Sequence, residues 1–310
     1  MAGNTYGSGD KRGSGSGRRD GGRRDERPGS GERGRSGDRG RSGDRGRPDD
    51  RGRPGSDRRG GRDRPGDSRD PRSRDIERTV DQETYDGPPI PDDVTPKDLD
   101  KLVMRGLNSL PDKLAERVAR HLVMAGRLLD EEPEIAYKHA QAARARASRV
   151  AVVREACGET AYATGKFAEA LSELRAAKRL NGAWYYTPMM ADCERALKRP
   201  ERAVAMAKPE THAKLDQDGQ VELSIVAAGA RRDMGQPEAA LRLLEAEPLH
   251  TNSRAEWVAR LRYAYADALL AAGREADALE WFHRTEAVDG NRMTDAHEQV
   301  ARLEAAAKNN

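Results

Sequence analysis

Apolar side chains are almost absent from the first eighty residues and return with a helical period from Leu99 onward. From there they recur at spacings of three and four residues, which is typical of one face of an α-helix. No β-branched stretch shows the apolar and polar alternation of a strand. The pattern therefore predicts an all-α fold that follows a long polar segment. The sizeable apolar side chains of that segment are Met1, Tyr6, Ile76 and Val80.

The first helix is predicted to begin at Thr95-Pro96. Threonine is a common N-cap and proline fits the first helical position. The acidic stretch before it contains Pro88, Pro89 and Pro91, which favour an extended linker. We therefore divide the chain into a tail at 1–80, a linker at 81–94 and a helical domain at 95–310. Helices at about 96–109 and 294–307 are expected to cap the two ends of this domain.

A short pattern recurs inside the helical region, in which a turn residue stands five positions before a small residue. The clearest copies run from Gly165 to Ala170, from Gly235 to Ala240 and from Gly273 to Ala278. With two weaker copies, the aligned alanines lie 33 to 38 residues apart, and they are Ala136, Ala170, Ala203, Ala240 and Ala278. A period of this length indicates stacked helical hairpins.

This pattern resembles the tetratricopeptide repeat (TPR), a helical hairpin of about 34 residues. The best copy matches the family's turn glycine, aromatic and Glu-Ala pair at Gly165, Phe167, Glu169 and Ala170. The family's small residue in the first helix is met at Gly158, Ala191, Ala228 and Ala266, whereas the earliest repeat has Met124. Over about residues 111–288, the resemblance implies a right-handed superhelical solenoid of antiparallel helix pairs.

The first helices of such a solenoid line a concave groove that commonly holds a peptide or a partner helix. The resemblance places twelve side chains there: His121, Glu155, Glu159, Tyr162, Tyr185, Met189, Asp192, Arg195, Glu222, Arg232, Tyr263 and Asp267. Within Trp184-Tyr185-Tyr186 an aromatic anchor for a partner is expected. The alternative is that two of the three pack against the preceding hairpin. The Lys/Asn/Arg clamp of some TPR proteins is absent, because its places hold Val118, His121, Glu155, Glu159, Pro188 and Asp192.

Charge separates the tail from the rest of the chain. Residues 1–80 hold 23 Lys and Arg against 15 Asp and Glu, and a six-residue Arg-Ser-Gly-Asp-Arg-Gly unit recurs from Arg35. Ordering a backbone costs about 1–2 kcal/mol per residue, which four apolar side chains cannot offset, so the tail is expected to be disordered. Its arginines favour nucleic-acid phosphates or acidic proteins as ligands. The alternative is a solvated spacer, because carboxylates are interspersed and Tyr6 is its only aromatic residue.

Candidate catalytic chemistry is sparse. The six histidines are scattered singly, and no His-Glu-x-x-His, paired Cys ligands or Gly-x-Ser-x-Gly is present. Cys157 and Cys193 are expected to be small core side chains. No run reaches the roughly 18 apolar residues of a membrane span, and no signal peptide is apparent. We expect no enzyme activity, cofactor, metal or membrane partner, and a cytoplasmic location.

These observations predict a scaffold or adaptor that binds a partner protein or peptide in the groove of a TPR-like solenoid. The alternative is an RNA- or ribonucleoprotein-associated factor that uses the Arg-rich tail for its affinity. The oligomeric state stays open at this stage.

Overall fold

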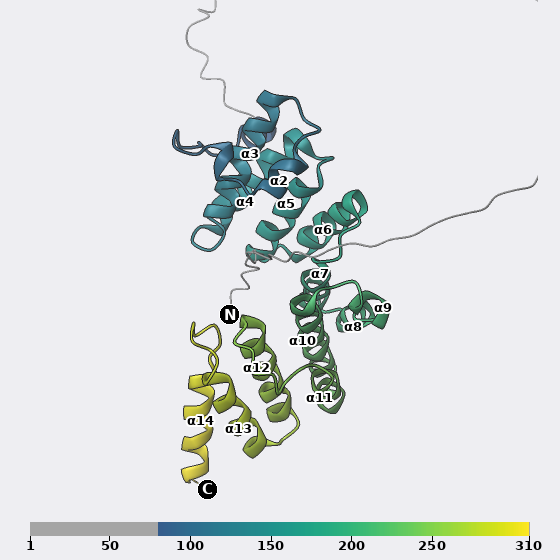
Figure 1. The fold of residues 1–310 in the computed structure, drawn as a ribbon, viewed down its shortest axis with the longest axis vertical. Coiled ribbons are helices and arrows are strands. Elements are labelled where there is room, and N and C mark those ends of the chain that lie inside the picture. The colour runs from purple at the N-terminus through teal and green to yellow at the C-terminus, as the bar shows by residue number, and fades with distance from the viewer. Residues whose placement is uncertain (1–79, 310) are drawn as a thin grey trace, which may run out of the picture. The chain divides into compact units, whose positions relative to one another are not determined.

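The computed structural model describes residues 80–309, which fold into helices joined by turns and loops (Figure 1). They form fourteen α-helices and one short 3-10 helix, with no strand in this range. The predicted all-α fold is confirmed. None of these helices is both long enough and apolar enough to cross a membrane. The predicted disordered tail lies outside the described residues, apart from Val80.

Ten of the helices form five consecutive hairpins, in which two helices joined by a short turn pack on each other. Helices α4, α6 and α11 each also pack on the first helix of the next hairpin, while α10 contacts both α7 and α8. Short helix α9 (Pro209–His212) separates the third and fourth hairpins. The hairpins are α3 (Asp112–Arg127) with α4 (Pro133–Ala147), α5 (Ala151–Ala163) with α6 (Phe167–Asn181), α7 (Thr187–Ala196) with α8 (Pro200–Met206), α10 (Gln217–Asp233) with α11 (Pro237–Glu245), and α12 (Glu256–Ala271) with α13 (Glu275–Glu286).

The same register recurs in every hairpin. The fourth residue of each second helix is a fully buried alanine: Ala136, Ala170, Ala203, Ala240 and Ala278. Five positions earlier, Gly165, Gly235 and Gly273 adopt φ angles of +72°, +71° and +75°. Lys198 occupies the same position in the third hairpin with φ +61°, although a side chain disfavours this conformation. One period of the sequence therefore corresponds to one helix pair.

Small residues let the two helices of a hairpin approach closely. A Cβ added to Gly158 would lie 2.4 Å from Cδ2 of Leu174, closer than packed carbon atoms can come. Ala191, Ala228 and Ala266 stand at the corresponding places of the later hairpins and are almost fully buried. The small residue of the first helix is thus buried in each of these four hairpins.

The amino-terminal cap differs from the single helix predicted at about 96–109. A 3-10 helix, η1 (Pro96–Asp98), is followed by α2 (Lys101–Gly106), with Leu99 in extended backbone between them. Asp100 causes a second helix start, because its carboxylate accepts a hydrogen bond from the Leu102 backbone N–H at 2.7 Å. In this arrangement Leu102 is 70% exposed.

The packed part of the chain begins before residue 95. Helix α1 (Val80–Asp86) packs on α4, and Val94 is buried against Val123 and Met124 of α3. Arg120 of α3 donates hydrogen bonds to the carbonyl oxygens of Val94 at 2.8 Å and Pro91 at 2.9 Å. The proline-containing segment is therefore held along α3.

The carboxy-terminal cap follows the sequence pattern. Helix α14 (Ala296–Asn309) buries Val300 and Leu303 in a cluster with Phe282 of α13, while Arg302 and Lys308 are exposed. Before the helix, Asp289 accepts hydrogen bonds from the Met293 and Thr294 backbone N–H groups, which fixes the entry to α14.

Candidate partner-binding groove

The first helices of the hairpins form a row in which polar side chains bridge neighbours. Helix α3 packs on α5, and α10 packs on both α7 and α12. Tyr162 of α5 donates a 2.5 Å hydrogen bond to Asp192 of α7. Both residues of this bond are among the side chains that the sequence places in the groove.

Ion pairs continue the series toward the carboxy terminus. Arg195 of α7 donates to Asp233 of α10 at 2.6 Å, and Arg232 of α10 pairs with Asp267 of α12. Two further bridges bind Glu222 of α10 to Arg260 of α12, and Tyr263 of α12 to Asp295 before α14. In this half of the row each of these predicted groove side chains therefore has a polar partner on a neighbouring element, and in the Arg232–Asp267 pair both partners were predicted.

The remaining carboxylates, Glu155 and Glu159 of α5, are bonded differently. Glu155 accepts hydrogen bonds from the Tyr185 hydroxyl and, at 2.7 Å, from the Asn181 amide. Glu159 accepts one from the Tyr186 hydroxyl. Among residues 80–309, no lysine or arginine forms an ion pair with either carboxylate. These two groups are therefore held by neutral donors alone.

A cavity of about 180 Å³ adjoins both carboxylates. Its polar lining includes Glu155, Glu159 and Tyr186. The rest of the wall is mostly apolar and comes from α2, α3, α5, the segment before α2 and the residues after α3. These residues are Leu99, Val103, Leu122, Ala125, Gly126, Leu129, Val152, Ala156 and Thr160. Burial raises the pKa of Glu159 to about 7, the charge of Glu155 adds to this rise, and the Tyr186 hydrogen bond opposes it. The Leu99 and Val103 wall is not predicted from the sequence, because the helix at about 96–109 is expected only to cap the domain.

The aromatic cluster divides into one exposed ring and two packed ones. Tyr185 is 51% exposed, and its ring lies against Tyr186 with centroids 4.7 Å apart. Tyr186 reaches the preceding hairpin through Glu159, and Trp184 lies beneath the Lys178 ammonium group. Met189 is also placed away from the groove surface, because it is 3% exposed and packs in the core with Leu171 and Cys193. Tyr185 is therefore the aromatic side chain that remains available to a partner.

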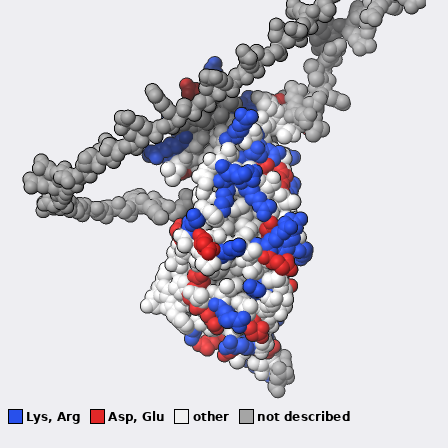
Figure 2. All heavy atoms as spheres, turned by 90° about the vertical axis from the view of Figure 1, so that its right-hand side faces the viewer, with Lys and Arg blue, Asp and Glu red and all other residues white. Residues whose placement is uncertain are grey.

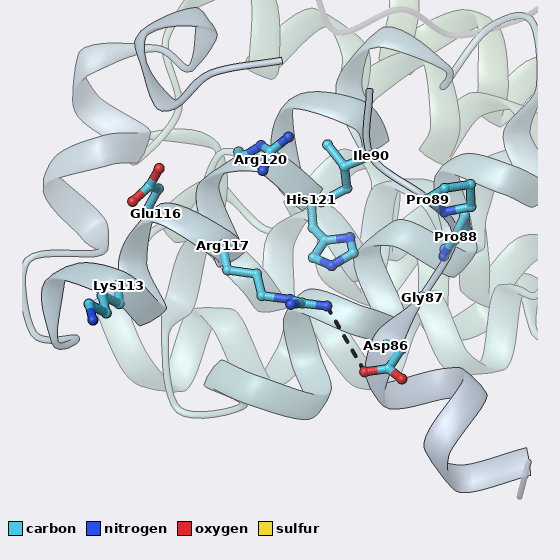
Figure 3. Close-up of a pocket in the computed structure, with 10 residues that line it drawn as sticks. All are labelled: Asp86, Gly87, Pro88, Pro89, Ile90, Lys113, Glu116, Arg117, Arg120 and His121. Carbon is cyan, nitrogen blue, oxygen red and sulfur yellow. Dashed lines mark ion pairs between the residues drawn. The ribbon is translucent and has the colours of Figure 1, made fainter. Parts of the chain in front are cut away.

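A second pocket, of about 540 Å³, lies between α3 and residues 86–90 (Figure 3). Figure 3 shows Arg117 extending toward Asp86, with their charged atoms 4.0 Å apart. His121 lines this pocket and not the groove cavity, which is lined by the next α3 residue, Leu122. The buried His121 and His139 rings place their Nδ1 atoms 3.0 Å apart. Burial lowers the pKa of His121 to about 3 and that of His139 to about 4. At His121, the charges of His139 and Arg146 lower the pKa further.

No group of three or more His, Cys, Asp or Glu side chains in 80–309 is arranged to hold a metal ion. Cys157 and Cys193 are buried and unpaired, as expected of core side chains. A comparison with known protein families found no match, and a comparison with curated proteins found no significant similarity.

Proposed function

We propose that this protein is an adaptor with TPR-like repeats whose groove binds a partner segment carrying a lysine or arginine side chain. The observation that supports this is the apolar cavity beside Glu155 and Glu159, two carboxylates without a cationic partner among residues 80–309. The long methylene stem of lysine or arginine suits apolar walls, and its charged end suits the carboxylates. Exposed Tyr185 adds an aromatic contact next to them.

The electrostatics of Glu159 favour a cationic ligand. With a pKa of about 7, the Glu159 carboxyl is mostly neutral below that pH, because burial disfavours its charged form more than the Tyr186 hydrogen bond favours it. A bound ammonium or guanidinium group stabilises the ionised form and lowers this pKa. Binding therefore releases a proton near pH 6 but not at pH 8, so affinity is expected to rise between these values.

The repeated register supports an adaptor over other classes of protein. Five hairpins bury an alanine at the same place, and the first helices stand in a row. Rows of this kind offer extended surfaces for partners. The alternative role in RNA binding through the tail depends on residues 1–80, which lie outside the described residues apart from Val80.

The experiment uses four fluorescent nine-residue peptide pools that differ only at the central position, which is Arg, Lys, Gln or Glu. Fluorescence polarisation with the full chain is expected to show at least tenfold tighter binding of the Arg and Lys pools, and tighter binding at pH 8 than at pH 6. The double variant Glu155→Gln, Glu159→Gln is expected to lose both preferences.

The matched control carries Glu238→Gln and Glu275→Gln, which remove two exposed carboxylates from α11 and α13. It changes net charge equally and is expected to keep both preferences. Equal binding of all four pools to the unaltered chain, or a preference that survives in the groove variant, contradicts the proposal.

A further inference from the structure

A basic surface lies on the second and third hairpins, and none of its side chains lines the groove cavity. We define the basic face by six side chains: Arg175, Lys178 and Arg179 of α6, Arg199 and Arg202 at the start of α8, and Lys214 after α9. From Arg175 to Lys214 the chain has nine lysines and arginines, of which seven are exposed. It has four carboxylates in the same stretch, of which only Glu201 and Glu210 are exposed.

Contacts through Glu194 and Trp184 bring four of the six members of the basic face together in pairs. Buried Glu194 binds Arg175 of α6 at 2.6 Å and Arg199 at 3.5 Å. The Trp184 ring lies 3.2 Å from the Lys178 ammonium group and 5.0 Å from that of Lys214. Cations from α6, from α8 and from the segment after α9 are therefore neighbours.

The charges of this surface are not balanced. Burial and the nearby charge of Lys214 lower the pKa of Lys178, as expected where cations repel one another. Figure 2, which faces the side where α8 and α9 lie in Figure 1, shows several groups of Lys and Arg on this side of the molecule, with Asp and Glu between them. Holding like charges together favours a polyanionic ligand that offsets the repulsion.

We propose that the basic face binds the phosphate backbone of a nucleic acid without reading its sequence. Phosphates need exposed Lys and Arg side chains but no deep pocket, and neither cavity of the described residues involves this face. The Trp184 ring is already covered by two lysines, which favours backbone contacts over base stacking.

A nucleic acid fits these observations better than an acidic protein does. Its charge is regular along its length, so one strand can contact cations of α6, the start of α8 and the segment after α9 in succession. An acidic protein would have to present its carboxylates at matching places. The inference does not depend on the groove, which carries carboxylates.

The test measures binding of a fluorescein-labelled 20-nucleotide oligouridine to the full chain between 50 and 300 mM salt. The face variant carries Arg179→Gln, Arg202→Gln and Lys214→Gln, which leaves Arg175, Arg199 and Lys178 in their contacts. The control variant carries Arg242→Gln, Arg254→Gln and Lys308→Gln, three exposed cations outside the face. Both variants lose the same net charge and both keep residues 1–80.

For single strands the slope of log K against log salt is about 0.7 per phosphate contact, so loss of three contacts reduces the slope by about 2. The face variant is expected to show this reduction with at least tenfold weaker binding at 100 mM salt, while the control keeps the original slope. Circular dichroism and the thermal midpoint confirm that both variants are folded.

Three results overturn the proposal. One is equal slopes for the two variants, which assigns any RNA binding to residues outside the face. Another is no binding of oligouridine by the unaltered chain at 50 mM salt. The third is that a 20-residue oligoglutamate binds the unaltered chain as tightly as RNA does, and that the face variant binds both ligands equally more weakly. This result identifies an acidic protein as the partner class.

Discussion

At the residue scale, the His121–His139 pair links stability to pH. Both rings are buried, and their pKa values of about 3 and about 4 lie below that of an unfolded histidine, about 6.5. Between pH 4 and 6.5 the unfolded chain therefore binds more protons than the folded chain, so stability falls as pH falls through this range. With about 1.4 kcal/mol per pH unit for each proton, the two histidines are expected to remove about 2 kcal/mol between pH 7 and 5.5.

Urea denaturation at pH 7 and 5.5 measures this loss. His139→Gln keeps a hydrogen-bonding side chain beside His121 and is expected to halve the difference between the two pH values. The control, His297→Gln, changes a side chain that is 84% exposed and is expected to leave the difference intact. An unchanged pH dependence in His139→Gln shows that other groups cause the acid sensitivity.

The same pair shows which residue-scale features the sequence does not predict. On a helix, adjacent residues differ by about 100° in direction, so His121 and Leu122 line different pockets. The repeat register of the first hairpin is also the weakest, because Met124 stands where the other hairpins have a small residue. Glu155 and Glu159, in the best-matching repeat, do line the groove cavity.

At the element scale, the close crossing of α5 and α6 predicts a large effect from one methyl group. In Gly158→Ala the new Cβ would lie 2.4 Å from Leu174, and the hairpin must open or Leu174 must move. We expect a loss of about 1–3 kcal/mol in the free energy of unfolding, measured by urea denaturation.

Gly126→Ala in α3 is the matched control, because a Cβ added to Gly126 would have no neighbouring atom within 4 Å. Alanine favours helix over glycine, so this variant is expected to gain up to about 1 kcal/mol. Destabilisation of equal size in both variants would mean that the crossing is looser than the structure indicates.

The hairpins could be located from the sequence because residues at and near each turn determine where they form. Turn glycines and the alanines five residues later gave the hairpins, because both the left-handed turn and the close crossing restrict the residue type. The split of the amino-terminal cap was missed, since Asp100 caps a new helix inside an apolar stripe. The packing of Pro91 and Val94 was missed for another reason: it depends on Arg120, which is distant in sequence.

At the scale of the whole molecule, the two proposed surfaces differ in charge as well as in place. The groove cavity is lined by two α5 carboxylates that form no ion pair among residues 80–309. The basic face instead has clustered cations from α6, the start of α8 and the segment after α9. Average composition hides this division, because the full chain has a net charge of only +3. A single protein can thus offer one surface to a cationic peptide and another to a polyanion.

Packing between neighbouring hairpins predicts that damage at one end stays local. Val300 and Leu303 of α14 pack with Phe282 of α13, whereas α3 to α6 share no substantial contact with α14. In arrays of this kind, stability is a sum of repeat and nearest-neighbour contributions. The double variant Val300→Ala, Leu303→Ala is therefore expected to speed amide hydrogen exchange at least tenfold in α12 to α14 and to leave α3 to α6 unchanged.

Hydrogen exchange followed by mass spectrometry resolves these segments in one measurement. Arg302→Ala, on the exposed side of α14, is the control and is expected to change neither end. Equally faster exchange in α3 to α6 would show that the hairpins unfold as one cooperative unit. If the faster exchange is confined to α12 to α14, contacts between adjacent hairpins hold the described helices together, and a shared central core does not.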